Sequence, residues 1–153
     1  MPWIEFGPQG QQSTAPEFRL QTPGGETVTR AQFRHRQHLV LCFLPPTLSA
    51  EDQEQVQRLR DAQDDIAEAS ARLYLLARHA STLPPDLPLL LDPDDAVRQR
   101  YAALFPPGEK PSAEEPFTVI LDRYGAPAHI TAGWPEFGEV LVRLWGLQYE
   151  CPE

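Results

Sequence analysis

The sequence is poor in cysteine and in long apolar runs. It holds two cysteines, Cys42 and Cys151, and neither belongs to a C-x-x-C motif. Two thiols cannot build a disulfide framework or fill a tetrahedral thiolate metal site. No apolar stretch approaches the about 18 residues needed to span a membrane, and the first five residues lack the basic start of a secretory signal. We therefore predict a cytoplasmic protein without a membrane partner.

Positive charge is also scarce. The 153 residues include 22 acidic and 13 basic side chains, which gives a formal net charge of −9. An even acidic excess repels phosphate backbones, so nucleic acid is not an expected partner. Length and a hydrophobic content of 41% indicate one globular domain, residues 1–153. Within it we predict an irregular lead-in over residues 1–14 and a C-terminal tail over residues 148–153.

Short apolar runs alternate with helical patterns along the chain. Residues 39–44 form a continuous apolar run, which is typical of a strand buried on both faces. Ser49 is a suitable N-cap for the helix that follows. This order predicts an α/β fold with a parallel-containing sheet covered on both faces. Further strands are predicted at 17–20, 27–29, 72–77, 89–91, 117–121 and 128–131, and helices at 50–69, from Pro93 and from Pro135.

Five short motifs occur in the order and spacing of one known family. They are Ala15–Leu20, Gly24–Val28, Phe43–Pro45, Leu87–Tyr101 and Phe117–Gly125. Together they resemble the peroxiredoxins, the alkyl hydroperoxide reductase and thiol-specific antioxidant group of the redoxins. The resemblance implies a thioredoxin-like fold, in which helices flank a central mixed β-sheet and a β-hairpin precedes it. It also implies a role in cell redox homeostasis.

The resemblance further implies a peroxidatic motif, P-x-x-x-T/S-x-x-C, whose thiolate lies in the first turn of a helix. Pro45 and Ser49 fill the first two positions, but Asp52 occupies the cysteine position. A carboxylate cannot pass through a sulfenic acid and cannot replace the thiol. Pro116 occupies the position of the family's arginine. The usual peroxidatic site is therefore predicted to be absent.

Pro116 also coincides with the cis-proline of thioredoxin, and the resemblance implies a cis bond here. The alternative is a proline at the first residue of a strand, where no ladder donor is needed. Trp134 follows the last predicted strand and is expected near the same face. Ser49, Pro116 and Trp134 thus mark a candidate surface for a protein or thiol partner.

The two cysteines are the remaining candidates for thiol chemistry. Cys42 lies inside an apolar strand and is expected to be a small buried residue with a raised pKa. Cys151 follows the last helix, where it could serve as a resolving thiol or link two chains into a homodimer. Its neighbours Glu150 and Glu153 should raise its pKa and slow its reactions.

The histidine pair His35-x-x-His38 has a spacing that metal ligands use. Arg34 and Arg36 flank it, and their positive charge disfavours a divalent cation. We interpret this segment as a solvated loop before a strand and predict neither a metal nor a cofactor.

Three functions remain open from the sequence. The favoured one is a peroxiredoxin-like protein without classical peroxidase activity. The second is a thiol-dependent oxidoreductase that acts through Cys151 or Cys42. The third is a non-enzymatic binding module on the same scaffold.

Overall fold

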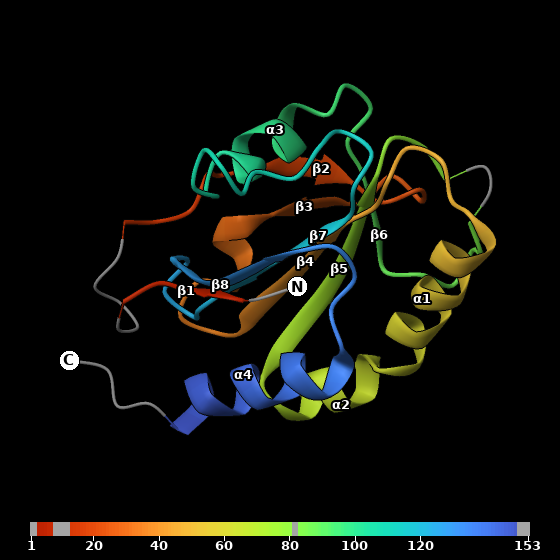
Figure 1. Cartoon of the computed structure of the whole chain (residues 1–153). Coiled ribbons are helices and arrows are strands. Elements are labelled where there is room, and N and C mark those ends of the chain that lie inside the picture. Colours follow the sequence, from red (N-terminus) through yellow and green to blue (C-terminus); the bar gives the residue numbers. More distant parts are fainter. Residues whose placement is uncertain (1–2, 8–12, 81–82, 150–153) are drawn as a thin grey trace.

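The structure, a computed structural model, describes residues 3–7, 13–80 and 83–149. Within them, one eight-stranded mixed sheet has helices on both faces (Figure 1). The strand order is β1-β8-β7-β4-β5-β6-β2-β3. The strands are β1 (Ile4–Glu5), β2 (Arg19–Gln21), β3 (Thr27–Thr29), β4 (His38–Phe43), β5 (Ala71–Ala77), β6 (Leu89–Leu91), β7 (Phe117–Leu121) and β8 (Pro127–Ala132). The helices are η1 (Arg30–Phe33), α1 (Ala50–Asp61), α2 (Gln63–Glu68), α3 (Ala96–Ala102) and α4 (Phe137–Tyr149).

Strand β4 lies inside the sheet, and all six of its residues are buried. It pairs in parallel with β5 and antiparallel with β7. The prediction of a strand buried on both faces is therefore confirmed. The predicted hairpin is also present, because β2 pairs antiparallel with β3.

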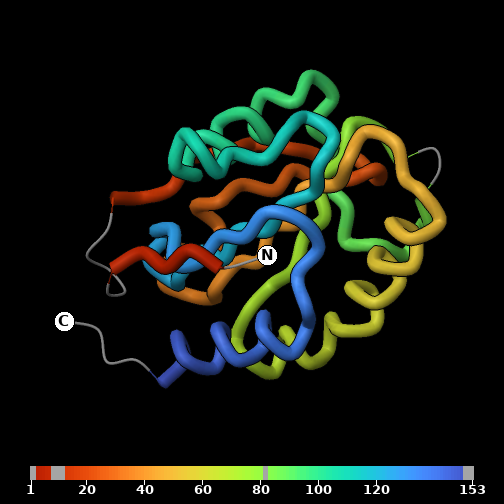
Figure 2. Tube along the Cα trace, viewed as in Figure 1, coloured from red at the N-terminus to blue at the C-terminus, as the bar shows by residue number. Residues whose placement is uncertain are grey.

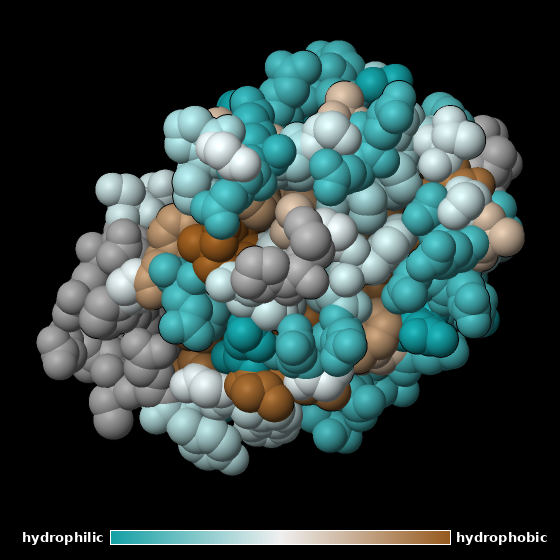
Figure 3. All heavy atoms as spheres, in the orientation of Figure 1, coloured by the Kyte–Doolittle hydropathy of each residue, from teal (hydrophilic) through white to brown (hydrophobic). Residues whose placement is uncertain are grey.

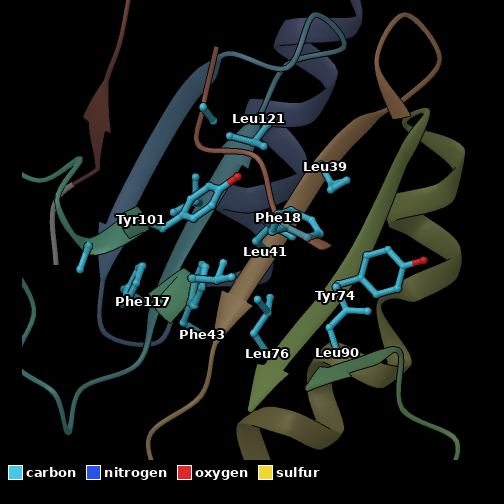
Figure 4. Packing of buried hydrophobic residues seen from close by; sticks show 14 of the residues in the cluster. Phe18, Leu39, Leu41, Phe43, Tyr74, Leu76, Leu90, Tyr101, Phe117 and Leu121 are labelled. Carbon is cyan, nitrogen blue, oxygen red and sulfur yellow. The ribbon is translucent and has the colours of Figure 1, made fainter. Parts of the chain in front are cut away.

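Two apolar layers hold the helices against the sheet. On the α3 side the layer is rich in aromatic side chains, among them Phe43, Tyr101 and Phe117 (Figure 4). Phe43 stacks on Phe117 with ring centroids 4.4 Å apart. The Tyr101 hydroxyl donates to the Pro16 carbonyl at 2.6 Å. On the other side, α1, α2 and α4 contribute Val56, Leu59, Ile66, Val140 and Leu144. The mixed α/β class follows directly from these two covered faces.

The predicted lead-in is not wholly irregular. Ile4 and Glu5 form β1 and pair with Ile130 and His129 of β8, so two segments far apart in the sequence lie side by side (Figure 2). A two-residue strand carries too little periodicity to be visible in sequence. Its pairing covers the edge that β8 would otherwise expose.

Several element boundaries differ from the prediction. The helix predicted over 50–69 is divided at Ala62, where φ and ψ are −86° and −3°. Helix α3 begins at Ala96 rather than Pro93, because Asp92 forms a turn first and its carboxylate accepts from the Val97 and Arg98 amides. Helix α4 ends at Tyr149, two residues into the predicted tail. His38 is a buried residue of β4 and does not lie in the loop before it.

None of the helices in the described ranges is both long enough and apolar enough to cross a bilayer.

Candidate functional site

The loop after β4 leads into α1 through a capping box. The Asp52 amide donates to the Ser49 hydroxyl at 3.1 Å, and the Ser49 amide donates to Asp52 Oδ2 at 2.9 Å. Each residue thus satisfies a backbone donor that the first turn of a helix leaves unpaired. Ser49 is confirmed as the N-cap, and Asp52 is the third residue of the helix.

Trp134 reaches the same carboxylate from the segment between β8 and α4. Its indole Nε1 donates to Asp52 Oδ1 at 2.8 Å, so both carboxylate oxygens accept hydrogen bonds. Partial burial acts to raise the pKa of Asp52, but the bonds from the Ser49 amide, the Trp134 indole and the Ser49 hydroxyl outweigh it and lower the pKa. Asp52 is therefore an ionised structural group that joins α1 to the β8–α4 segment.

Pro45 and Pro116 lie at the same end of the sheet. Phe43 pairs with Phe117 across β4 and β7, and this register places Pro116 beside the start of the Pro45 loop. The Pro116 carbonyl accepts from the Gly133 amide at 2.8 Å, next to Trp134. The fold thus gathers the predicted positions Pro45, Ser49, Asp52, Pro116 and Trp134 around one sheet end.

The implied cis bond at Pro116 is wrong, since the peptide bond before this residue is trans. Pro116 directly precedes β7, where the missing N–H is not needed by the ladder. The carbonyl before it accepts from the Arg98 guanidinium. The alternative, a proline at the entry of a strand, describes its role.

Cys42 lies within β4, and none of it is exposed. Its sulfur accepts from the Thr118 hydroxyl at 3.6 Å. Burial raises the pKa of the Cys42 thiol to about 12, while Thr118 and Arg98 act in the opposite direction. At neutral pH this sulfur is a protonated thiol enclosed in the core, as the sequence predicts, and has neither the charge nor the access of a nucleophile.

Cys151 lies outside the described residues, so its predicted roles as a resolving thiol or a link between chains stay predictions.

Arg98, which lies beside the loop after β4, was not predicted as a site residue from the sequence. Arg98 comes from α3, and its buried guanidinium donates to the carbonyls of Leu44, at 3.0 Å, and of Ser112, at 3.2 Å. It also donates to the Glu115 carbonyl and lies over the Phe117 ring, 5.0 Å from its centroid. Burial lowers the pKa of Arg98, and Asp95 partly offsets this effect. The sequence signal was an arginine within the apolar stripe of a helix, between Val97 and Tyr101.

The space behind the loop is small. A cavity of about 30 Å³ lies at the carboxyl ends of β4 and β5, and the Arg78–Asp95 ion pair, with a closest N–O distance of 2.5 Å, lines it. A cavity of this size holds one or two water molecules. Two arginines that line it, Arg78 and Arg98, already have acidic or carbonyl partners.

In the part of the chain that the structure describes, no three histidine, cysteine, aspartate or glutamate side chains converge as metal ligands.

Comparison with known proteins gives a structural likeness without a sequence likeness. No family model matches the chain, and no curated protein matches its sequence. The fold is similar to that of peroxidoxin BcpB from Mycobacterium tuberculosis, with a TM-score of 0.70 at 17% identity over 90% of this chain and 97% of the other. Thioredoxin peroxidase I of Plasmodium yoelii gives 0.70 at 19% identity, over 90% of both chains.

Peroxiredoxin Q of Xanthomonas campestris gives a TM-score of 0.68 at 17% identity, over 86% of this chain and 92% of the other. The chain therefore has the thioredoxin-like fold in the form found in peroxiredoxins.

Proposed function

We propose that this chain is a peroxiredoxin-like protein of cell redox homeostasis that does not reduce peroxides at the helix position its fold relatives suggest. One observation carries the proposal: both oxygens of the Asp52 carboxylate are engaged, one by the Ser49 amide and one by the Trp134 indole. Asp52, at the family's cysteine position, instead connects α1 to the segment between β8 and α4 through these hydrogen bonds.

The chemistry of peroxide reduction explains why this substitution matters. A thiolate attacks the O–O bond, an S–O bond forms, and water or an alcohol leaves with the other oxygen. A carboxylate has no atom that can accept oxygen in this way. The described thiol, Cys42, is protonated and enclosed, so it does not supply the missing nucleophile.

The test is intact mass spectrometry after brief treatment with stoichiometric hydrogen peroxide. We expect no gain of one oxygen within minutes in the wild type. Asp52→Cys serves as the positive control, because it places a thiol at the exposed start of α1, where helix amides favour the thiolate. This variant should react faster than the wild type.

Cys151→Ser separates the alternative function from the proposed one. A rapid gain of oxygen or a disulfide-linked dimer that disappears in Cys151→Ser would contradict the proposal and support an oxidoreductase working through Cys151. The same reactions persisting in Cys151→Ser but lost in Cys42→Ser would point to Cys42 instead.

Binding is the second candidate function, and the loop surface favours it. Pro46 and Thr47 are exposed, while Leu48 and Trp134 are partly buried beside them. A protein partner is expected here, with the chain acting as a binding module. The test is an affinity pull-down with the immobilised chain. Proteins that bind the wild type should be lost with Leu48→Arg and kept with Ala103→Arg, an exposed position on the far side of the sheet. Equal retention by both variants would contradict this surface.

A further inference from the structure

Positive charge gathers in one segment of this acidic chain. Although the net charge is −9, no acidic residue stands between Glu26 and Glu51, and this stretch contains Arg30, Arg34 and Arg36. Arg30 begins η1, and Arg34 and Arg36 are exposed in the loop that joins η1 to β4. This loop lies at the opposite end of β4 from the segment that leads into α1 (Figure 1). We call the three arginines the basic corner.

The loop of the basic corner is held in place by backbone hydrogen bonds. The amides of Arg36 and Gln37 both donate to the Phe33 carbonyl at 3.0 Å. The His35 amide donates to the Arg123 carbonyl at 2.5 Å, which joins the loop to the turn between β7 and β8. Because the loop is already ordered, a ligand does not have to order it on binding.

Arg30 supplies a buried cation behind this loop. Its side chain is only 10% exposed, and its Nε and Nη1 atoms have no hydrogen-bond partner among the described residues. A Cβ at Gly125 would collide with Nη1, so the glycine leaves room for the guanidinium under the turn. Buried N–H groups without acceptors are rare in folded proteins, and they point to an acceptor that comes from outside the chain.

A small cavity lies next to the Arg30 guanidinium. Its volume is about 10 Å³, and its lining residues are Arg30, Phe33, Arg34, Gln37, Leu39, Leu121, Asp122 and Gly125. A volume of this size admits one water-sized group, such as a single oxygen atom of a larger anion. Because exposed Arg34 lines the cavity together with buried Arg30, the cavity leads from the buried cation to the surface of the basic corner.

The two carboxylates near the basic corner are already engaged by the backbone. Glu17 Oε1 accepts from two amides, at 2.8 and 3.0 Å, and Asp122 Oδ1 accepts from two others, at 2.8 and 3.1 Å. In the part of the chain that the structure describes, Arg34 and Arg36 form no ion pair. The basic corner therefore keeps an excess of positive charge.

These features favour a compact anion as the ligand. On the face of the molecule drawn in Figure 3, hydrophilic residues predominate and apolar residues form small separate patches, which are poor docking sites for an apolar partner. A long polyanion would extend over the acidic remainder of the chain, which repels it. A phosphate group is compact, and it has enough oxygens to meet Arg30 in the cavity and Arg34 at the surface, whereas a carboxylate has only two.

We infer that the basic corner binds a phosphate group, either as the free ion or as part of a small molecule. One phosphate oxygen occupies the cavity and accepts from Arg30, and the other oxygens accept from Arg34 and Arg36. The site lies at the opposite end of the sheet from Asp52 and uses no thiol, so it is independent of the function proposed above.

The test is a titration with inorganic phosphate, followed by nitrogen–proton correlation NMR of the isotope-labelled chain. Sodium chloride is adjusted to hold the ionic strength constant, so general screening does not contribute. We expect saturable shifts at the amides of His35, Arg36 and Tyr124, with a dissociation constant on the order of 1 mM. A parallel titration with phenyl phosphate distinguishes the two sources: tighter binding identifies a phosphate ester as the ligand, and weaker binding identifies the free ion.

Arg34→Gln should raise the dissociation constant at least about fivefold, because it removes a charged donor while the exposed position leaves the fold intact. Arg58→Gln is the matched control, since it removes the same charge from an exposed position on α1 and should leave the affinity unchanged. Shifts that stay linear up to about 20 mM phosphate would overturn the proposal. So would shifts that chloride alone reproduces, or an affinity that Arg34→Gln leaves unchanged.

Discussion

Asp52 and Cys42 show how the surroundings of a side chain decide what it can do. Asp52 sits at a helix start where a nucleophile would have the amide groups it needs, but its carboxylate is engaged by Ser49 and Trp134. Cys42 has the right sulfur chemistry, but it lies in a strand with no exposure. Each residue lacks what the other has, and the described part of the chain therefore presents no reactive thiolate.

Asp52→Asn should destabilise the fold by about 1–2 kcal/mol at pH 7, because a cap and a charge-assisted hydrogen bond each contribute on this scale. The folded pKa of Asp52 lies below its ordinary value of 3.8. Its contribution is therefore full above that value and is lost as pH falls through the folded pKa. The difference in free energy of unfolding between wild type and variant should shrink from pH 6 to pH 3.5.

Urea unfolding at the two pH values measures this difference. Glu51→Gln is the matched control, since Glu51 is an exposed acid in the same turn. A variant as stable as the wild type at pH 7 would contradict the structural role of Asp52.

Cys42 should resist alkylation in the native protein. With a thiol pKa of about 12 and no exposure, its reaction with iodoacetamide at pH 8 requires unfolding. In the Cys151→Ser background, mass spectrometry should find Cys42 unmodified over hours in buffer and modified within minutes in urea. Rapid native labelling would show that β4 opens locally and that Cys42 is available for chemistry.

At the scale of elements, the loops around the candidate site are held by an arginine on a different helix. Arg98 of α3 joins the end of β4 to the segment that precedes β7, through the carbonyls of Leu44, Ser112 and Glu115. The positive charge in this region thus comes from α3 and not from the residue before β7, which is Pro116. Its N–H groups are directed at backbone, and the guanidinium acts as a clamp.

Arg98→Met should therefore lower the free energy of unfolding by about 2–3 kcal/mol, since it leaves buried carbonyls without donors. Arg58→Met, at an exposed ion pair with Glu54, should change stability by less than about 0.5 kcal/mol. Denaturant unfolding compares the two variants. A loss below about 1 kcal/mol in Arg98→Met would mean that water replaces the guanidinium at all three carbonyls.

At the scale of the whole molecule, the described N-terminal segment is joined to β8 and α4. Strand β1 pairs with β8, and the Trp3 indole donates to Glu139 of α4 across 136 positions of sequence. The sheet is continuous from β1 to β3, so no plane divides the described residues into separate cores. The single domain over residues 1–153 stays a prediction, and it requires a continuous sheet of this kind.

A single domain should unfold in one cooperative step. Far-ultraviolet circular dichroism and tryptophan fluorescence, followed together during urea unfolding, should give coincident transitions. Trp3 reports on the N-terminal segment, Trp134 on the candidate site and Trp145 on α4, so the double variant Trp3→Phe, Trp145→Phe isolates the signal of the candidate site. Transitions with different midpoints would mean that the N-terminal segment separates first and that the domain boundaries need revision.

The sequence by itself determined the elements whose signals are local. The apolar run of β4, the Ser49 cap, the hairpin before β4 and the inner stripe of α4 depend on residue type and spacing over a few positions. Local patterns of this kind are set by backbone geometry and can be read without knowing the fold. The position of Asp52 in the motif followed from the same short-range information.

Only the tertiary structure decided which distant side chains meet. Nothing in the local pattern around Trp134 indicates that its indole binds Asp52, and nothing around Arg98 indicates three carbonyl partners. The addition of β1 to the sheet was likewise missed, and the trans bond at Pro116 was one of two alternatives that the sequence left open. These features depend on how strands and helices pack across 14 to 136 positions of sequence, where periodicity carries no information. Packing gives the Asp52 carboxylate its second partner, and this contact is visible only when both α1 and the segment between β8 and α4 are in place.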